Sequence, residues 1–375
     1  MRFWIFAWSM SMVCLSAEAK SKDPFQTELD LSPRYEYISS STQELANRLI
    51  LKSKLSVQKQ WFTFYFDGFA EFDNVPVEDT IRRTPNMGYL QELYVEGKWD
   101  SIFVRLGKQA LRWSETWVLP SLDIWTGRRW NRFLFDPQSE QFNHSTGGSV
   151  SYVGRNFTLD AVGITNLGET ELPQPLAPTI PGYTQNNTGG GVRGQLDVAG
   201  FHFSAIGAQQ ATRFYSGVTG NYAFDFMVPK LEGGMVTDTH DPVTSGQTQV
   251  YFGTAGIDFF AGRWTITPQF TGFTNQNPYL PYQNEGIAYV SATYQDNPHD
   301  LQMSALYNPV NYDSFCNISY NYNLNNHVSV GGFLQSYYGV INVPMPSIYA
   351  QYANIVGTGF IAGARFEVLG DWSSR

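Results

Sequence analysis

The feature that most constrains the fold of this chain is an alternation of apolar and polar side chains. Around residue 65, Phe62, Phe64 and Phe66 fall on one face of an extended chain, whereas Thr63 and Asp67 fall on the other. The same alternation recurs in two later stretches: 192–198 and 264–271. Because successive side chains of a β-strand point to opposite faces, the pattern predicts strands with one apolar and one polar face.

Turn-forming residues divide these strands into pairs. Tight turns are expected at 58–60, 99–101, 154–156, 199–200, 261–263, 297–299 and 325–326. Longer segments rich in polar residues, Pro and Gly lie between the pairs, notably 114–144, 166–188 and 213–247. Short turns that alternate with long loops are typical of outer-membrane β-barrels, whose short turns face the periplasm.

The strand count is consistent with a closed barrel. The first two strands are expected at 27–38 and 45–57, and the last at 357–369. Counting through the pairs gives about 16 strands, within a range of about 14 to 18, because 215–228 could add a pair. The predicted fold class is therefore all-β: a transmembrane antiparallel β-barrel. A barrel of about this size leaves an aqueous channel inside.

Alternation alone does not separate a membrane barrel from a soluble β-sandwich, so composition has to decide. Aromatic residues make up 16% of the chain and charged residues 15%. No stretch after residue 19 approaches the roughly 18 consecutive apolar residues of a membrane-spanning helix. An aromatic-rich chain without such a helix fits a membrane barrel, in which polar residues dilute the apolar ones.

The N-terminus predicts export. A basic start at Arg2 is followed by an apolar run at 3–15 and by Ala17-Glu18-Ala19, the pattern of a cleaved signal peptide. We expect a signal peptide at 1–19 and a single barrel domain at 20–375, in a bacterial outer membrane. Cys14 offers a lipoprotein site as the alternative, although bulky Val13 before it favours ordinary cleavage.

Cofactor chemistry has little support in the sequence. Cleavage would leave Cys316 as the one cysteine, which we expect to be a packed, inert side chain. No Cys and His set has the spacing of a zinc site, and we predict no cofactor and no metal. The formal net charge of −9 argues against nucleic acid as a partner.

One short motif resembles a known family. Porin-like Gram-negative barrels of the alginate-export and related uncharacterised type carry a Gly-Arg-Gln strand, then Trp-Gly-Glu, Leu-Asp and Asn-Pro-Arg. The matching residues here are Gly107, Gln109, Trp113, Glu115, Leu122 and Asp123. Lys108 and Ser114 replace an Arg and a Gly, and the Asn-Pro-Arg is not intact. The match is confined to 105–132, so it implies a porin-like barrel and leaves the solute open.

The same stretch has a physical interpretation. It places Arg105, Gly107 and Gln109 on the polar face of a fifth strand at 102–113, which makes 114–144 the third long loop. In general porins, by resemblance, the third loop folds into the lumen and narrows it. Our candidates for a pore constriction are Arg105, Gln109, Arg112, Glu115, Asp123, Trp125, Arg128, Arg129, Trp130 and Arg132. A ring of basic side chains around a pore favours anions, but the nearby carboxylates could neutralise these arginines. The alternative is that the segment forms a membrane-interface belt or a solvated loop.

Charged residues on other strands are expected to face the lumen. These candidates are Asp67, Glu71, Glu92, Glu96, Lys98, Arg193, Asp197 and Arg365. They could form a water-contacting network or a charge ladder that guides a solute, and the sequence does not separate the two.

Enzymatic patterns are weak. The stretch Gly189–Gly194 satisfies G-x-G-x-x-G, but it opens an alternating strand rather than a helix, as a nucleotide site would require. His202 and Ser204 share the polar face of one strand, and His144 precedes Ser145, yet no orienting acid can be assigned to either pair. We therefore predict that the chain is not an enzyme.

These features together predict passive diffusion of small hydrophilic solutes, with anions as one option, through a barrel embedded in outer-membrane lipid. Resemblance to general porins implies a homotrimer. The alternatives are a receptor or adhesin that uses long loops such as 213–247, and an outer-membrane hydrolase. The end of the chain is atypical, because Trp372 is followed by three further residues where an assembly signal normally ends on an aromatic.

Overall fold

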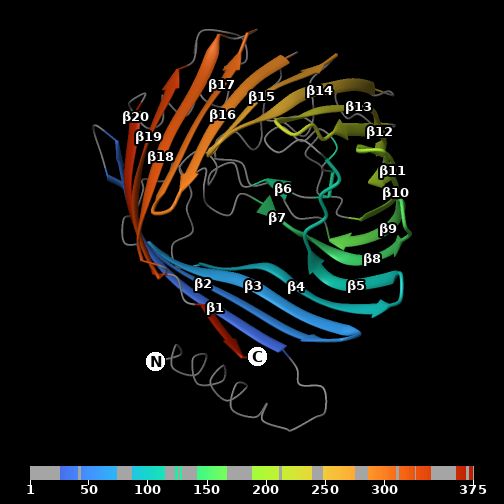
Figure 1. Cartoon of the computed structure of the whole chain (residues 1–375), viewed down its shortest axis with the longest axis horizontal. Coiled ribbons are helices and arrows are strands. Elements are labelled where there is room, and N and C mark those ends of the chain that lie inside the picture. Colours follow the sequence, from blue (N-terminus) through green and yellow to red (C-terminus); the bar gives the residue numbers. More distant parts are fainter. Residues whose placement is uncertain are drawn as a thin grey trace.

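The computed structural model shows a single closed β-barrel (Figure 1). It describes residues 26–40, 44–73, 87–114, 122, 124–125, 127–128, 142–166, 188–210, 213–238, 248–274, 286–309, 312–325, 327–338, 360–368 and 371–374. The predicted signal peptide lies outside these residues and stays a prediction. Within the described residues, no helix has the length and apolar character needed to cross a membrane.

The barrel wall is built from consecutive antiparallel strands. The first half comprises β1 (Gln26–Ser40), β2 (Glu44–Lys59), β3 (Phe62–Asp73), β4 (Met87–Trp99), β5 (Ile102–Gln109), β8 (Ser145–Val153), β9 (Phe157–Asn166), β10 (Gly189–Val198) and β11 (Phe201–Gln210). The second half comprises β12 (Arg213–Tyr222), β13 (Met227–Asp238), β14 (Thr248–Ala261), β15 (Trp264–Phe273), β16 (Gly286–Asp296), β17 (His299–Asn308), β18 (Asp313–Asn325), β19 (Val328–Tyr338), β20 (Phe360–Val368) and β21 (Asp371–Ser374).

Closure comes from the two ends of the chain. β1 pairs with β2 on one side and with both β20 and β21 on the other. Because β20 and β21 lie end to end along β1 and act as one strand, the wall has 18 strands. The predicted range includes this number, whereas the central count of about 16 was too low.

The missing pair lies in the segment that we expected to be a long loop. Residues 213–247 contain β12 and β13, so only 239–247 remain as the connection to β14. Both strands present large apolar side chains outward, including Phe214, Val218 and Leu231, which are 49%, 61% and 65% exposed. Their inward faces include Gly217 and Gly234, which weaken the alternation that marks a strand in the sequence. All the tight turns predicted from the sequence join neighbouring strands of the barrel.

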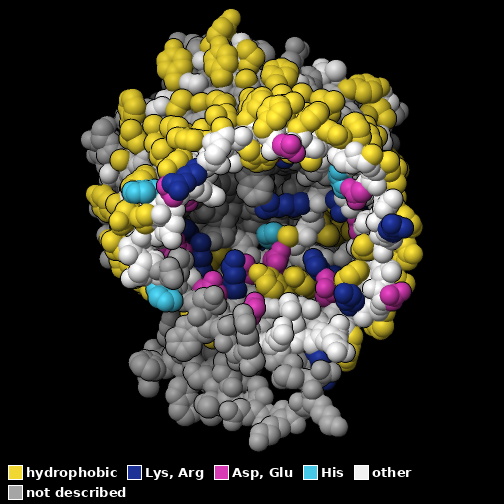
Figure 2. All heavy atoms as spheres, in the orientation of Figure 1, with side chains coloured by type: hydrophobic (Ala, Val, Ile, Leu, Met, Phe, Trp, Pro, Cys, Tyr) yellow, Lys and Arg dark blue, Asp and Glu magenta, His cyan; other side chains and the backbone are white. Residues whose placement is uncertain are grey.

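The two faces of the wall are inverted relative to a soluble protein. On β9, Leu159 is 53% exposed and points outward, whereas Asp160 and Val162 face inward and are buried. Hydrophobic side chains cover much of the outer surface, and charged ones gather around the central opening (Figure 2). Cys316 lies on the outward face of β18 and is exposed, so the expectation of a packed side chain was wrong. Cys316 faces outward because its two neighbours on the strand, Phe315 and Asn317, face inward.

A short two-stranded sheet lies inside the barrel. β6 (Gly127–Arg128) pairs with β7 (Phe142–Asn143), and both belong to the connection between β5 and β8. Figure 1 shows them within the ring of wall strands. The third long connection therefore enters the lumen.

Candidate functional site: a segment folded into the lumen

The segment that follows β5 leaves the wall and buries apolar side chains inside the barrel. Trp113, Leu122, Ile124 and Trp125 are each exposed by 8% or less, although outward apolar residues of the neighbouring strands are exposed. The rings of Trp113 and Trp125 meet edge to face, with their centroids 5.4 Å apart and their planes at 89°, a favourable aromatic geometry. These side chains form a compact apolar unit within a polar lumen.

Glu92 fixes both ends of the connection from β5 to β8. Its Oε1 accepts a hydrogen bond of 2.9 Å from the backbone N–H of Ala110, at the start of the segment. The same oxygen lies 3.5 Å from Nδ1 of His144, at its end. One inward carboxylate on β4 therefore holds the two stems together.

Glu232, on β13, holds the middle of the segment from a distant part of the wall. Its Oε1 accepts a hydrogen bond of 2.8 Å from the backbone N–H of Leu122, and its Oε2 accepts one from the Ser114 hydroxyl. Glu232 is 5% exposed. Since hydrogen bonds to a charged group are among the stronger ones, this carboxylate anchors the described middle part of the segment.

Glycines on the wall make room for the segment. A Cβ atom on Gly191 would lie 3.0 Å from the Trp125 ring, and one on Gly217 would lie 2.5 Å from the Leu122 side chain. Gly189 also approaches Trp125, at 3.0 Å. The stretch Gly189–Gly194 therefore opens β10, as expected, and two of its glycines receive an aromatic ring rather than a nucleotide.

A pocket of about 160 Å³ lies between the segment and the wall. Its lining includes Glu96, Arg105, Arg112, Trp113, Asp160 and Arg193. Arg105 pairs with Glu96 at 2.7 Å, and Arg193 pairs with Asp160 at 2.8 Å. Among the described lining residues, three guanidinium groups face two carboxylates, an excess of one positive charge.

Arg193 links the wall to the segment. Its Nη1 donates a hydrogen bond of 3.2 Å to the backbone carbonyl of Arg112, and its guanidinium lies 5.8 Å from the centre of the Trp113 ring. Cation–π contact of this kind adds to the hydrogen bond. The pocket can therefore present charged groups and an aromatic face to the same solute.

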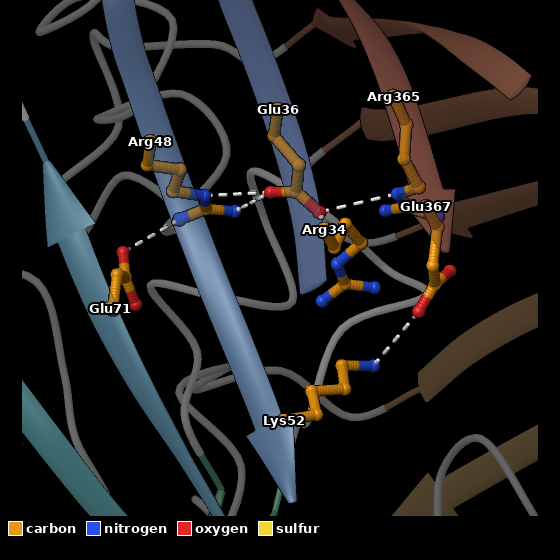
Figure 3. A network of polar contacts seen from close by, with 7 residues as sticks. All are labelled: Arg34, Glu36, Arg48, Lys52, Glu71, Arg365 and Glu367. Carbon is orange, nitrogen blue, oxygen red and sulfur yellow. Dashed lines mark hydrogen bonds and ion pairs between the residues drawn. The ribbon is translucent and has the colours of Figure 1, made fainter. Parts of the chain in front are cut away.

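A second charged cluster lies at the seam where the barrel closes (Figure 3). The carboxylate of Glu36 on β1 contacts Arg34 at 2.9 Å, Arg48 on β2 at 2.5 Å and Arg365 on β20 at 3.2 Å. Arg48 also pairs with Glu71 on β3 at 3.1 Å. All five residues are buried, each exposed by 8% or less. Because removal of one partner would leave buried charges without compensation, this network ties four strands together across the seam.

The structure places most of the charged candidates on the lumen face. Those with inward positions are Asp67, Glu71, Glu92, Glu96, Lys98, Arg105, Gln109, Arg193, Asp197 and Arg365. Lys98 and Asp197 lie near tight turns, and Asp197 pairs with His202. Arg112 lies exposed at the pocket and Trp125 is buried. Arg128 lies in β6, and Glu115, Asp123, Arg129, Trp130 and Arg132 lie outside the described residues.

The histidine pairs that suggested an enzyme have other partners. The Ser204 hydroxyl bonds to the Thr219 hydroxyl at 2.6 Å, whereas Nδ1 of His202 bonds to Asp197 at 2.6 Å. His144 contacts Glu92 at the stem of the segment. Among the described residues, no group of His, Cys, Asp and Glu is arranged to hold a metal ion.

Sequence reasoning missed Glu232 and three members of the seam cluster, Arg34, Glu36 and Arg48. A signal was present for the cluster, because these residues alternate with Tyr35, Tyr37 and Leu49 on the outward face. Nothing in the sequence indicated the partners of Glu232, which lie more than 100 residues away in the chain.

Comparisons with known proteins support the fold. No protein-family model and no curated protein sequence matches the chain. Solved structures do: OccAB3 of Acinetobacter baumannii has a TM-score of 0.61 at 9% identity, with 93% of this chain and 99% of that chain covered. OpdK of Pseudomonas aeruginosa, solved with vanillate, has a TM-score of 0.61 at 11% identity, with coverage of 93% and 99%. A BenF-like porin from Pseudomonas fluorescens Pf-5 has a TM-score of 0.62 at 10% identity, again covering 93% and 99%. The chain thus has the fold of porin-like outer-membrane barrels, and these structures do not support the alginate-export type in particular.

Proposed function

We propose that the chain is an outer-membrane channel for passive diffusion of small hydrophilic solutes, with the segment after β5 as its constriction. The observation that carries this proposal is the double anchoring of the segment inside the barrel, by Glu92 at its stems and by Glu232 across the wall. A segment that merely covered the barrel mouth would not need an anchor on an inward residue of a distant strand.

The polar lumen and the apolar exterior support a membrane location. Outward residues such as Leu106 and Leu231 are 56% and 65% exposed, as lipid contact requires. Export by the predicted signal peptide at 1–19 fits the same location. The likeness to solved porins supports the channel.

Anions are the favoured charged solutes of the pocket. OpdK was solved with vanillate, an aromatic carboxylate. Here the pocket combines an excess positive charge with the Trp113 ring, which suits a small aromatic or aliphatic anion. The finer resemblance to alginate-export barrels rests on the motif at 105–132 alone, and it stays a hypothesis.

The receptor or adhesin alternative is weaker than the sequence suggested, because β12 and β13 occupy most of the loop on which it relied. A homotrimer, implied by resemblance, is the assembly that we propose to test by cross-linking in membranes.

The proposal is tested by recording currents from the refolded protein in a planar lipid bilayer. Discrete, stable current steps in KCl would support a water-filled pore, and the sign of the reversal potential in a salt gradient would test the anion preference. Folded protein that inserts but carries no current would contradict the channel.

A further inference from the structure

The lumen wall has a long part without cationic side chains. Residues 264–364 contain no Lys and no Arg, and their four acidic residues are Glu285, Asp296, Asp300 and Asp313. The last three lie at or next to the ends of strands. We call the inward face of β15 to β19 the neutral wall, because its middle presents amides, hydroxyls and aromatic rings instead of charges.

Two amides at the centre of the neutral wall face each other across neighbouring strands. Asn317 on β18 is paired with Gln335 on β19, and both point inward, since Ile318 and Leu334 beside them are 49% exposed on the outside. Asn317 and Gln335 are only 1% and 0% exposed. A ring lies next to them, because Phe315 and Tyr337 form the adjacent inward pair at 5.2 Å.

Both amides have unused hydrogen-bonding capacity. Within the described part of the chain, neither Oδ1 nor Nδ2 of Asn317 has a hydrogen-bond partner. Oε1 of Gln335 accepts a bond of 2.7 Å from the Tyr337 hydroxyl, whereas its Nε2 has no partner in those same residues. A buried amide without a partner is costly, so a lumen-facing pair of this kind needs a ligand or water.

The chemistry of the pair selects the ligand. Nδ2 and Nε2 together offer N–H donors, and Oδ1 of Asn317 offers an acceptor. A carboxylate only accepts hydrogen bonds and would leave Oδ1 without a donor, while an ammonium group only donates. A hydroxyl both donates and accepts, and so satisfies all of these atoms.

Among the described residues, the strand positions in the row of the pair and in the next row carry no charged side chain. The hydrogen-bonded inward row through the pair consists of Thr267, Ser291, Ser304, Asn317, Gln335 and Ile361. The next row toward the periplasm consists of Gln302, Ser319, Phe333 and Gly363. Arg365 lies one row further and is paired with Glu36.

We propose that Asn317 and Gln335 form a binding subsite for uncharged, hydroxyl-rich solutes such as small sugars or polyols. The adjacent Phe315 ring would contact the C–H groups of the solute. This subsite is separate from the charged pocket at Arg105 and Arg193. It rests on the proposed channel function, and it divides the lumen into a charged track and a neutral track.

The test compares glucose with methanesulfonate, a small anion that carries no hydroxyl group. Liposomes carrying the wild-type channel, an Asn317→Leu/Gln335→Met variant or a Gln302→Met control are assayed for swelling in each solute, and the KCl conductance of each protein is recorded. Gln302 is an amide one row away on the same wall.

In the double variant we expect glucose uptake to fall roughly fivefold, as the loss of one or two neutral hydrogen bonds predicts. Methanesulfonate uptake and KCl conductance should stay unchanged, and Gln302→Met should behave as wild type. If the double variant does not insert, Asn317→Leu alone is measured against the same control.

An unchanged glucose rate in a conducting variant would overturn the subsite, and so would an equal fall for glucose and methanesulfonate. A wild-type protein that conducts no KCl would instead overturn the channel function on which the subsite depends.

Discussion

The two sides of the lumen wall satisfy their buried polar groups in different ways. We call the inward face of β1 to β5, β8 to β10 and β20 the charged wall. There, buried charges compensate one another, as in the contacts of Glu36 with three arginines. On the neutral wall, Asn317 is as deeply buried as Glu36 but has no partner among the described residues. The charged wall therefore pairs its buried polar groups with one another, whereas the neutral wall leaves some of its buried polar groups without a partner among the described residues.

The largest expected effect is a loss of stability when a buried charge of the charged wall is removed. Glu36→Leu would leave Arg34, Arg48 and Arg365 buried without their shared carboxylate. We expect a loss of about 3–5 kcal/mol in the free energy of unfolding, measured by urea denaturation of the refolded barrel. The matched change on the neutral wall, Asn317→Leu, should be neutral or stabilising, because it replaces an unpartnered amide with an apolar group of similar shape. Equal losses in the two variants would abolish the distinction between the walls.

The second effect is on the anchored segment. Glu232→Leu removes the acceptor of both the Leu122 N–H and the Ser114 hydroxyl. Because hydrogen bonds to a charged group contribute about 1.5–3 kcal/mol each, the segment should detach from β13 and the single-channel conductance should rise and become noisier. Glu232→Gln keeps one acceptor oxygen and should have an intermediate conductance. Wild-type conductance in both variants would mean that the segment does not form the constriction.

Two glycines on one strand provide a sharper test of the same constriction. Gly191→Ala places a Cβ atom 2.7 Å from the Ala208 Cβ and 3.0 Å from the Trp125 ring, whereas nothing lies within 4 Å of a Cβ on Gly194. We expect Gly191→Ala to cost about 1–3 kcal/mol and to raise the conductance by displacing Trp125. Gly194→Ala should leave the free energy of unfolding and the conductance unchanged. The two variants are compared by urea denaturation and by bilayer recording, and an indistinguishable pair would contradict the packing of Trp125 on β10.

The strands of the barrel wall could be predicted from the sequence better than the contacts inside the lumen. Alternation around Phe64 and the tight turns are local signals, since one strand or one turn suffices to produce them. Glycines on the inward faces of β12 and β13 weaken the alternation in this pair of strands. The predicted number of strands was therefore too low by one pair. Glu232 and Glu36 act on partners brought together only by the closed barrel, and Arg365 lies 329 residues from Glu36. Their inward orientation could be read from the sequence, but their contacts could not.

The smallest expected effect concerns charge at the pocket. Arg112 is exposed, so its field is screened by salt and its contribution is modest. Arg112→Gln should shift the reversal potential toward cations by a few millivolts at low ionic strength, with a smaller shift at high salt. Changing Arg128, Arg129 and Arg132 to Ala tests the sequence-based hypothesis in the same gradient. As the matched control, Gln335→Met on the neutral wall removes no charge and should leave the reversal potential unchanged. A shift of the same size in Gln335→Met would show that the shift in Arg112→Gln does not come from the lost charge.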